Sequence, residues 1–276
     1  MAKQAQANRD WMQTLRWGYR AMLALCILAG GLYAFHETEQ FLISDNRFRL
    51  ESPAEYGMDP PGIRIQGAAY VSRKEILSIF AKDYGKSLYL VPVSKRREEC
   101  LKLEWVKDAT VSRFWPNQIL VRIEERVPAA LVPAGHNRGW YIDTDGVLLR
   151  IPSPSPFRVP VLLGVNSSEE APSRAERVKR MMRVMREAGR HSDRLTIVDV
   201  TDMDNVKVTE TFGSRALTLW LGGKNFLSRL DGFERSYPDA RRQMPDDTVF
   251  DLRIDNRISN VPRSGGEKSG GEKKGD

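Results

Sequence analysis

The chain has 276 residues, of which 41% are apolar and 29% are charged, so it can form one or two packed cores. This composition excludes a protein with many membrane spans and a wholly disordered chain. The net charge of +7 is a mild excess that is compatible with anionic lipid or polymer. No zinc-finger spacing, RNA-stacking motif or dense arginine tract accompanies it, so nucleic-acid binding is disfavoured.

Cysteines and histidines are few and widely spaced. Cys26 lies in an apolar, membrane-like segment and Cys100 lies in the folded part, so a membrane would keep them apart and we expect no disulfide between them and a free thiol at Cys100. The three histidines, His36, His136 and His191, are scattered and predict no metal site.

Residues 21–35 contain no charged side chain and predict a membrane-spanning helix over 21–36. As a helix the uncharged run is about 22 Å long, against about 30 Å of bilayer core, and Arg20 and the flanking Trp17 and Tyr33 can extend it at the interfaces. A cleaved signal peptide and a buried helix of a soluble protein are the alternatives.

Charge asymmetry predicts the orientation of this helix. The upstream segment is basic (Lys3, Arg9, Arg16 and Arg20, opposed by Asp10), and the downstream segment is acidic (Glu37, Glu39 and Asp45). By the positive-inside rule, residues 1–20 form a cytoplasmic tail and the remainder lies outside the cell membrane.

A small unit of strands and two short helices is predicted next. Residues 37–62 are expected to form a linker with a short strand at Arg47–Leu50, and a further strand begins at Ile63. Ser72 and Glu75 have the spacing of a capping box that opens a helix ending at Gly85. Ser94 is expected to cap a second short helix.

The stretch WVKDATVSRFWPNQILVRIEERVPAAL, residues 105–131, predicts a β-hairpin that turns at Trp-Pro-Asn. Alternation assigns one set of side chains to a buried face: Ala109, Val111, Ile119, Val121 and Ile123. The opposite face would present Thr110, Ser112, Arg122 and Glu124 to solvent.

A second set of elements follows Pro128. Residues 140–149 predict another hairpin, whose Asp143–Gly146 turn is favoured over a calcium loop because no glutamate stands at the required position. Ser173 and Glu176 predict a capped helix up to Gly189, with an apolar face (Val178, Met181, Met182, Met185 and Ala188) and a basic face (Arg174, Arg177, Arg180, Arg183 and Arg186). The basic face is interpreted as solvated, with lipid headgroups or an acidic partner as the alternative.

The last elements are three strands, a helix and an edge strand. The strands are predicted at Leu195–Val200, Val206–Thr209 and Ala216–Leu221, followed by a helix capped by Asn225. Thr248–Ile254 is the last strand and an edge candidate. The tail from 264 to 276 repeats SGGEK without any apolar residue and is expected to be disordered.

Several pieces in this order resemble the FtsQ/DivIB family of bacterial cell-division proteins. They are LEWVKDA (103–109) running into RFWPN (113–117), then EERVPAA (124–130) and YIDTDGV (141–147), with weaker likeness at PVLLG (160–164) and DLR (251–253). The resemblance covers about residues 17–260, and Ser52–Pro61 looks like an insertion relative to the family.

The resemblance implies an α+β chain with a single transmembrane helix, a POTRA domain (β-α-α-β-β) at 63–127, a β-rich domain with flanking helices at 128–260 and a tail at 261–276. It implies a non-enzymatic scaffold of the inner membrane at the division septum, which binds other divisome components. In the family, an edge strand of the β domain pairs with FtsB, which is joined to FtsL, by β-augmentation. By position that strand is Thr248–Ile254, with Val249, Phe250, Asp251, Leu252, Arg253 and Ile254 as the partner-binding residues.

Two other classes compete with the scaffold. A wall-active enzyme would need a nucleophile beside a base or paired carboxylates, and no G-x-S-x-G, H-E-x-x-H or S-x-x-K set is present, so catalytic residues, cofactors and a small-molecule substrate are not expected. An envelope assembly or secretion factor can also contain POTRA domains, but it usually has several repeats and a barrel.

Overall fold

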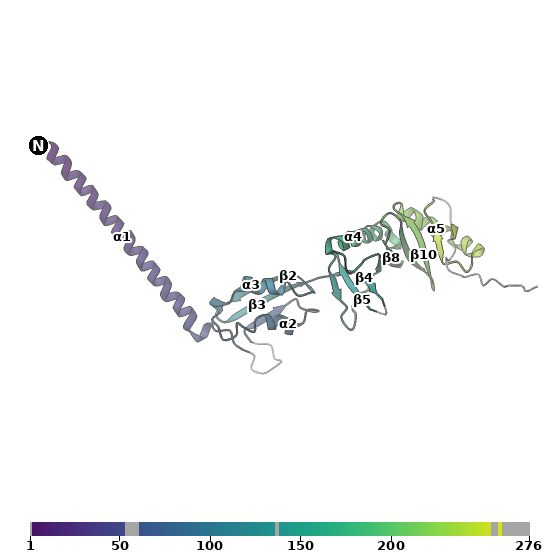
Figure 1. Ribbon diagram of the computed structural model, residues 1–276, viewed down its shortest axis with the longest axis horizontal. Helices are drawn as coiled ribbons and strands as arrows, with labels where there is room; N and C mark the ends of the chain where they lie inside the picture. The colour runs from purple at the N-terminus through teal and green to yellow at the C-terminus, as the bar shows by residue number, and fades with distance from the viewer. Residues whose placement is uncertain (1, 53–60, 136–137, 255–258, 261–276) are drawn as a thin grey trace, which may run out of the picture. The chain divides into compact units, whose positions relative to one another are not determined.

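The computed structural model describes residues 2–52, 61–135, 138–254 and 259–260 (Figure 1). Most of the predicted insertion Ser52–Pro61 and the SGGEK tail lie outside the described residues. The chain divides into two compact units, Met1–Glu125 and Arg126–Asp276. The predicted fold class is confirmed: an apolar N-terminal helix precedes a β-α-α-β-β unit and a β-rich unit with flanking helices.

The first unit follows the expected order of strand, helix, helix, strand and strand. Its elements are α1 (Ala2–Ser44), η1 (Asn46–Phe48), β1 (Ile63–Gln66), α2 (Arg73–Ile79), η2 (Leu88–Leu90), α3 (Val93–Cys100), β2 (Val106–Phe114) and β3 (Gln118–Glu125). In the sheet, β3 is central, parallel to β1 and antiparallel to β2.

Helix α1 extends well beyond the predicted span. Its segment Arg16–Ser44 is long and apolar enough to cross a membrane, and it is the one such helix in the described part of the chain. The helix continues through residues 37–44, where a linker was predicted, because no proline or glycine interrupts the sequence between Gly31 and Ser44. It ends where Asp45 accepts a hydrogen bond from the amide of Arg47 and opens η1.

Four local predictions in this unit were wrong. The strand at Arg47–Leu50 is a 3-10 turn, with a single bridge from Arg49 to Ser87. Ser72 stands at the N-cap of α2 without a side-chain cap bond, and α2 ends at Ile79 instead of Gly85. Ser94 lies inside α3, because Pro92 takes the N-cap position.

Alternation correctly predicted both faces of the β2–β3 hairpin. The five side chains assigned to the inner face are buried, and Thr110, Ser112, Arg122 and Glu124 are exposed. Helix α3 packs against β2, and its Cys100 is a fully buried free cysteine. Burial raises the pKa of the Cys100 thiol to about 11, so the thiol is protonated near neutral pH.

The carboxylate of Glu125, the last residue of β3, binds the loop between β1 and α2. The Oε1 atom of Glu125 accepts hydrogen bonds from three successive amides, those of Ala69, Tyr70 and Val71, at 2.9, 2.7 and 2.7 Å. These amides precede α2, so the bonds fix the loop between β1 and α2 against the last residue of β3. Hydrogen bonds to an ionised acceptor are stronger than neutral ones.

Replacing Glu125 with alanine should therefore lower the free energy of unfolding of the first unit by about 1.5–3 kcal/mol, because three amides lose a charged acceptor. Equilibrium denaturation followed by the fluorescence of Trp105, whose ring contacts Tyr70, measures this loss. The matched control is Glu124→Ala, since the exposed Glu124 pairs with Lys107 at 3.3 Å, and exposed pairs contribute about 0–1 kcal/mol. Equal losses in the two variants would contradict the role given to Glu125.

The second unit contains a mixed nine-stranded sheet within the described residues. Its elements are β4 (Pro128–Ala134), β5 (Arg138–Asp143), β6 (Leu148–Arg150), β7 (Val161–Leu163), α4 (Ala171–Glu187), η3 (Gly189–Arg194), β8 (Leu195–Asp199), β9 (Val206–Phe212), β10 (Arg215–Gly222), α5 (Phe226–Gln243), β11 (Val249–Asp251) and β12 (Ser259–Asn260). The strand order is β12-β11-β10-β9-β8-β7-β4-β5-β6.

Helices α4 and α5 contribute to one core with the sheet, so they cover the same face of it (Figure 1). The apolar face of α4 is formed by Val178, Met181 and Val184, whereas the predicted Met182 is 40% exposed. The predicted cap at Ser173 was wrong, because α4 begins at Ala171 with Glu170 at its N-cap. Asn225 does precede α5, but in a left-handed conformation without a side-chain cap bond.

Three of the five arginines on the basic face of α4 bind the unit's own backbone. Arg174 donates to the carbonyl of Gly146 at 2.8 Å, Arg177 to that of Val200 at 3.2 Å and Arg180 to that of Gly223 at 3.1 Å, so these three join α4 to the loops around it. Arg183 and Arg186 are exposed, as the solvated interpretation predicts.

The Asp143–Gly146 segment is a hairpin turn, as expected. Asp143 accepts hydrogen bonds from the amides of Asp145 and Val147, and its other oxygen pairs with Arg126 at 2.5 Å. Gly146 has a φ of +78°, and a Cβ there would lie 2.2 Å from the carbonyl oxygen of Ala171, so only glycine fits. One oxygen of Asp143 therefore binds the amides of the turn and the other binds Arg126.

Candidate partner-binding edge

The C-terminal end of the nine-stranded sheet is built by a crossover through α5. The chain leaves β10, forms α5 and returns as β11, which pairs in parallel with β10. The amide of Thr218 donates to the carbonyl of Thr248 at 2.8 Å, and that of Leu252 donates to Trp220 at 3.0 Å. These bonds hold β11 against β10 at both of its ends.

The predicted edge strand Thr248–Ile254 is shorter than expected and does not lie at the edge. The strand covers Val249–Asp251, and β12 pairs with its outer side through Phe250 with Asn260 and Asp251 with Ser259. Within the described residues, β12 is therefore the last strand of the sheet. Sequence periodicity missed β12 because two residues are too few to show alternation.

The six predicted partner-binding residues have three different environments. Phe250 is fully buried and Leu252 is 4% exposed, and both belong to the core under α4 and α5. The ring of Phe250 packs on Phe233 with 5.1 Å between centroids. Ile254, expected on the same face, lies beyond the strand and is 62% exposed, so it is the available apolar side chain.

Asp251 and Arg253 form a charged pair beside the edge. The Arg253 guanidinium contacts both oxygens of Asp251, at 2.9 Å from Nε to Oδ1 and 2.5 Å from Nη2 to Oδ2. It also lies over the ring of Trp220, 4.9 Å from the centroid, while Lys207 approaches the same ring at 4.8 Å. Val249, the remaining predicted residue, is half-buried. The Trp220 ring on β10, with the cations of Lys207 and Arg253 against it, therefore lies beside β11.

Truncation of the buried Phe250 and truncation of the exposed Ile254 should have different effects on the free energy of unfolding. We expect Phe250→Ala to lower the unfolding free energy by about 3–5 kcal/mol, since it leaves a cavity beside Phe233. Ile254→Ala, the matched control, should change it by less than about 0.5 kcal/mol, because the side chain is exposed. Chemical denaturation followed by Trp220 fluorescence measures both, and a large loss in the control would contradict the assignment of Ile254 to the surface.

The Asp251–Arg253 pair also predicts a pH dependence. The hydrogen bond from Arg253 lowers the pKa of Asp251. A carboxyl whose folded pKa is depressed stabilises the fold above its unfolded pKa, and this stabilisation is lost as the pH falls through the folded pKa. Arg253→Gln should raise the pKa of Asp251 toward the usual aspartate range, as measured by NMR titration of its carboxyl carbon. Arg242→Gln, which removes an exposed partner of Asp239, should leave the Asp251 titration unchanged.

A polar cluster that the sequence did not reveal lies between η3 and α5. His191 is fully buried, and its Nε2 atom lies 2.9 Å from Asp231 and 3.9 Å from Glu234. These three side chains are close enough to one another to hold a metal ion, although the scattered histidines predicted no such group. The signal was the i, i+3 spacing of Asp231 and Glu234, which places both on one face of α5.

Arginines already compensate the charges of this cluster. Arg190 contacts Asp231 at 2.7 Å and Glu234 at 2.9 Å, and Arg194 contacts Glu234 at 2.9 Å. His191 hydrogen-bonding to Asp231 and Arg194 hydrogen-bonding to Glu234 lower the pKa values of these carboxyls. Two guanidinium groups at this distance disfavour a bound cation, so the arrangement is that of an ion-pair network joining η3 to α5.

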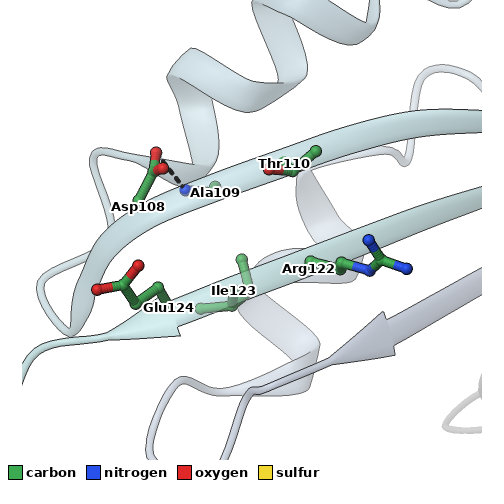
Figure 2. Close-up of a pocket in the computed structure, with 6 residues that line it drawn as sticks. All are labelled: Asp108, Ala109, Thr110, Arg122, Ile123 and Glu124. Carbon is green, nitrogen blue, oxygen red and sulfur yellow. Dashed lines mark hydrogen bonds between the residues drawn. The ribbon is translucent and has the colours of Figure 1, made fainter.

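The first unit has a shallow pocket of about 190 Å³ on the exposed face of β2 and β3. Figure 2 shows that it lies between the side chains of Asp108 and Thr110 on one strand and Arg122 and Glu124 on the other. Asp108 accepts the amide of Ala109 and pairs with Arg97, at 2.8 and 2.7 Å. Small-molecule sites are usually about 300–1,000 Å³ and more apolar, so this surface is too small and too polar for one.

The chain is similar to known proteins over most of its length. Residues 62–126 match the family model of the POTRA domain, FtsQ-type. The chain is 33% identical over 224 residues to a protein of Koribacter versatilis named Cell division protein FtsQ, covering 79% of this chain and 62% of that protein. It is 22% identical over 250 residues to a protein of the same name from Syntrophotalea carbinolica, covering 88% of this chain and 83% of that one. The resemblance found in the sequence is confirmed.

Proposed function

From an FtsQ-type POTRA domain at residues 62–126 and a similarity to Cell division protein FtsQ over 79% of the chain, we propose that this protein is a non-enzymatic scaffold of the bacterial division machinery. It is a single-pass protein whose α1 crosses the inner membrane. The basic residues before α1 and the acidic residues after it support a cytoplasmic N-terminus and an extracytoplasmic location for both units.

The scaffold binds a division partner at the end of its nine-stranded sheet. The partners are FtsB- and FtsL-like proteins, and the binding mode is β-augmentation, in which an added strand pairs with unsatisfied backbone groups at a sheet edge. The observation that carries this proposal is that, in the described part of the chain, the sheet ends in the two-residue β12, which pairs with β11 on one side.

We propose partner-binding residues that differ from those expected from the sequence. The incoming strand pairs with Ser259–Asn260 instead of with Val249–Ile254. Phe250 and Leu252 support the edge from within the core, and exposed Ile254 and Arg253 provide side-chain contacts next to it. Backbone pairing supplies affinity in this mode, while the flanking side chains supply specificity.

Ser259→Pro tests this mode, because proline interrupts β12 at a position that pairs with Asp251 and not with the buried Phe250. We expect the full-length variant to lose co-purification with the co-expressed FtsB- and FtsL-like proteins while its melting temperature stays within a few degrees of that of the parent. The matched control is Arg150→Pro in β6, at the opposite end of the same sheet, which should keep the partners. Retained binding by the Ser259 variant would refute pairing at β12.

Localisation tests the division role separately. With a fluorescent protein fused to the N-terminus, the scaffold should form a band at mid-cell during constriction. Uniform fluorescence around the envelope would contradict the division role and favour an envelope assembly factor or a wall-active enzyme.

A further inference from the structure

Three aromatic rings join the end of α1 to the tip of the POTRA hairpin. Phe41 lies in the last turn of α1, Phe48 in η1 and Trp115 in the turn between β2 and β3. Phe48 stands edge-on to both neighbours, with 5.6 Å between ring centroids in each pair. The end of the helix and the hairpin turn are therefore in direct contact within the first unit.

The outer rings of this group are exposed although they are large and apolar. Phe41 is 49% exposed, Trp115 is 46% exposed, and Phe114 beside it is 59% exposed. At the other end of the same strand, Trp105 is 8% exposed and packs on Tyr70. The unit thus buries Trp105 at one end of β2 and exposes Phe114 and Trp115 at the end next to α1.

The position of Phe41 on α1 gives the height of these rings above the hydrocarbon core. It stands six residues after Phe35, the last residue of the uncharged run, which is about 9 Å along a helix. The headgroup layer on each side of a bilayer is about 5–8 Å thick. A modest helix tilt brings Phe41 into this layer, where aromatic side chains are enriched in membrane proteins.

Hydrogen bonds hold the POTRA unit close to this end of α1. The hydroxyl of Ser87 donates to the carbonyl of Leu42 at 2.6 Å, and the amide of Leu50 donates to the carbonyl of Lys86 at 3.0 Å. The segment η2 also packs against α1. Trp115 therefore cannot move far from the membrane surface while these contacts persist.

We propose that Phe41, Phe48, Phe114 and Trp115 form a second membrane contact, in which the tip of the POTRA hairpin lies in the headgroup layer of the bilayer that α1 crosses. The occupant of this surface is lipid, because Phe41 lies on the helix that forms the span, about one and a half turns beyond its uncharged run, and Phe48 and Trp115 contact it in succession. The inference rests on α1 crossing the membrane and is independent of the division partners. It fixes which end of the POTRA sheet faces the bilayer, since β3 ends at Glu125, at the opposite end from Trp115.

Two tryptophans at opposite ends of β2 allow the test to compare two distances from the membrane within one protein. Trp105 immediately precedes the nine-residue strand β2 and Trp115 immediately follows it, so they are roughly 30 Å apart at about 3.3 Å per residue. We would label the full-length protein with 5-fluorotryptophan and reconstitute it in nanodiscs that contain a lipid with a gadolinium chelate on its headgroup. Trp115→Phe and Trp105→Phe identify the two fluorine resonances by their loss.

The expected result is strong broadening of the Trp115 resonance, comparable to that of Trp17 at the start of the span, and an unchanged linewidth for Trp105. Equal linewidths for Trp115 and Trp105 beside a broadened Trp17 would overturn the hairpin contact and leave the span intact. An unbroadened Trp17 would overturn the span, and with it both this inference and the single-pass topology proposed above.

Discussion

The passage of the chain from one unit to the other depends on two adjacent residues of opposite charge. Glu125 ends β3 and binds three amides ahead of α2, whereas Arg126 binds Asp143 in the first hairpin of the next unit. Each residue thereby fixes one unit through charge-assisted hydrogen bonds, which are geometrically demanding. Val127, which follows them, is 71% exposed, and Pro128 then begins β4. Glu125 and Arg126 thus each make polar contacts within their own unit.

The parts of the fold that the sequence could predict are those in which one face of a sheet is buried. The β2–β3 hairpin was predicted with its correct faces because a sheet covered on one side forces strict alternation on each strand. The strands β8, β9 and β10 followed for the same reason. The resemblance to the FtsQ family was as informative, since Glu-Arg-Val-Pro-Ala-Ala lies where the two units meet.

Features that depend on tertiary contacts or on very short segments were not predictable in this way. Ser72, Ser94 and Ser173 have suitable cap chemistry, but Pro92 and Glu170 set two of the helix starts and no side-chain bond forms at the third. The strand β12 is too short to show a period, and it converts the predicted edge strand into an inner one. The carboxylate nearest in sequence to His191 in this cluster is Glu210, 19 residues away, and Asp231 is 40 residues away, so spacing alone could not bring these groups together.

The order of strands has a consequence for which chains are able to bind. Among the described elements, β11 and β12 come last in sequence, and they are added to β10 only after the α5 crossover. A chain interrupted before residue 249 therefore lacks the edge at which we propose that the partner binds. In the proposed binding mode, occupancy of that edge would report that synthesis has reached β11 and β12, so only molecules that contain these strands would assemble with the partner.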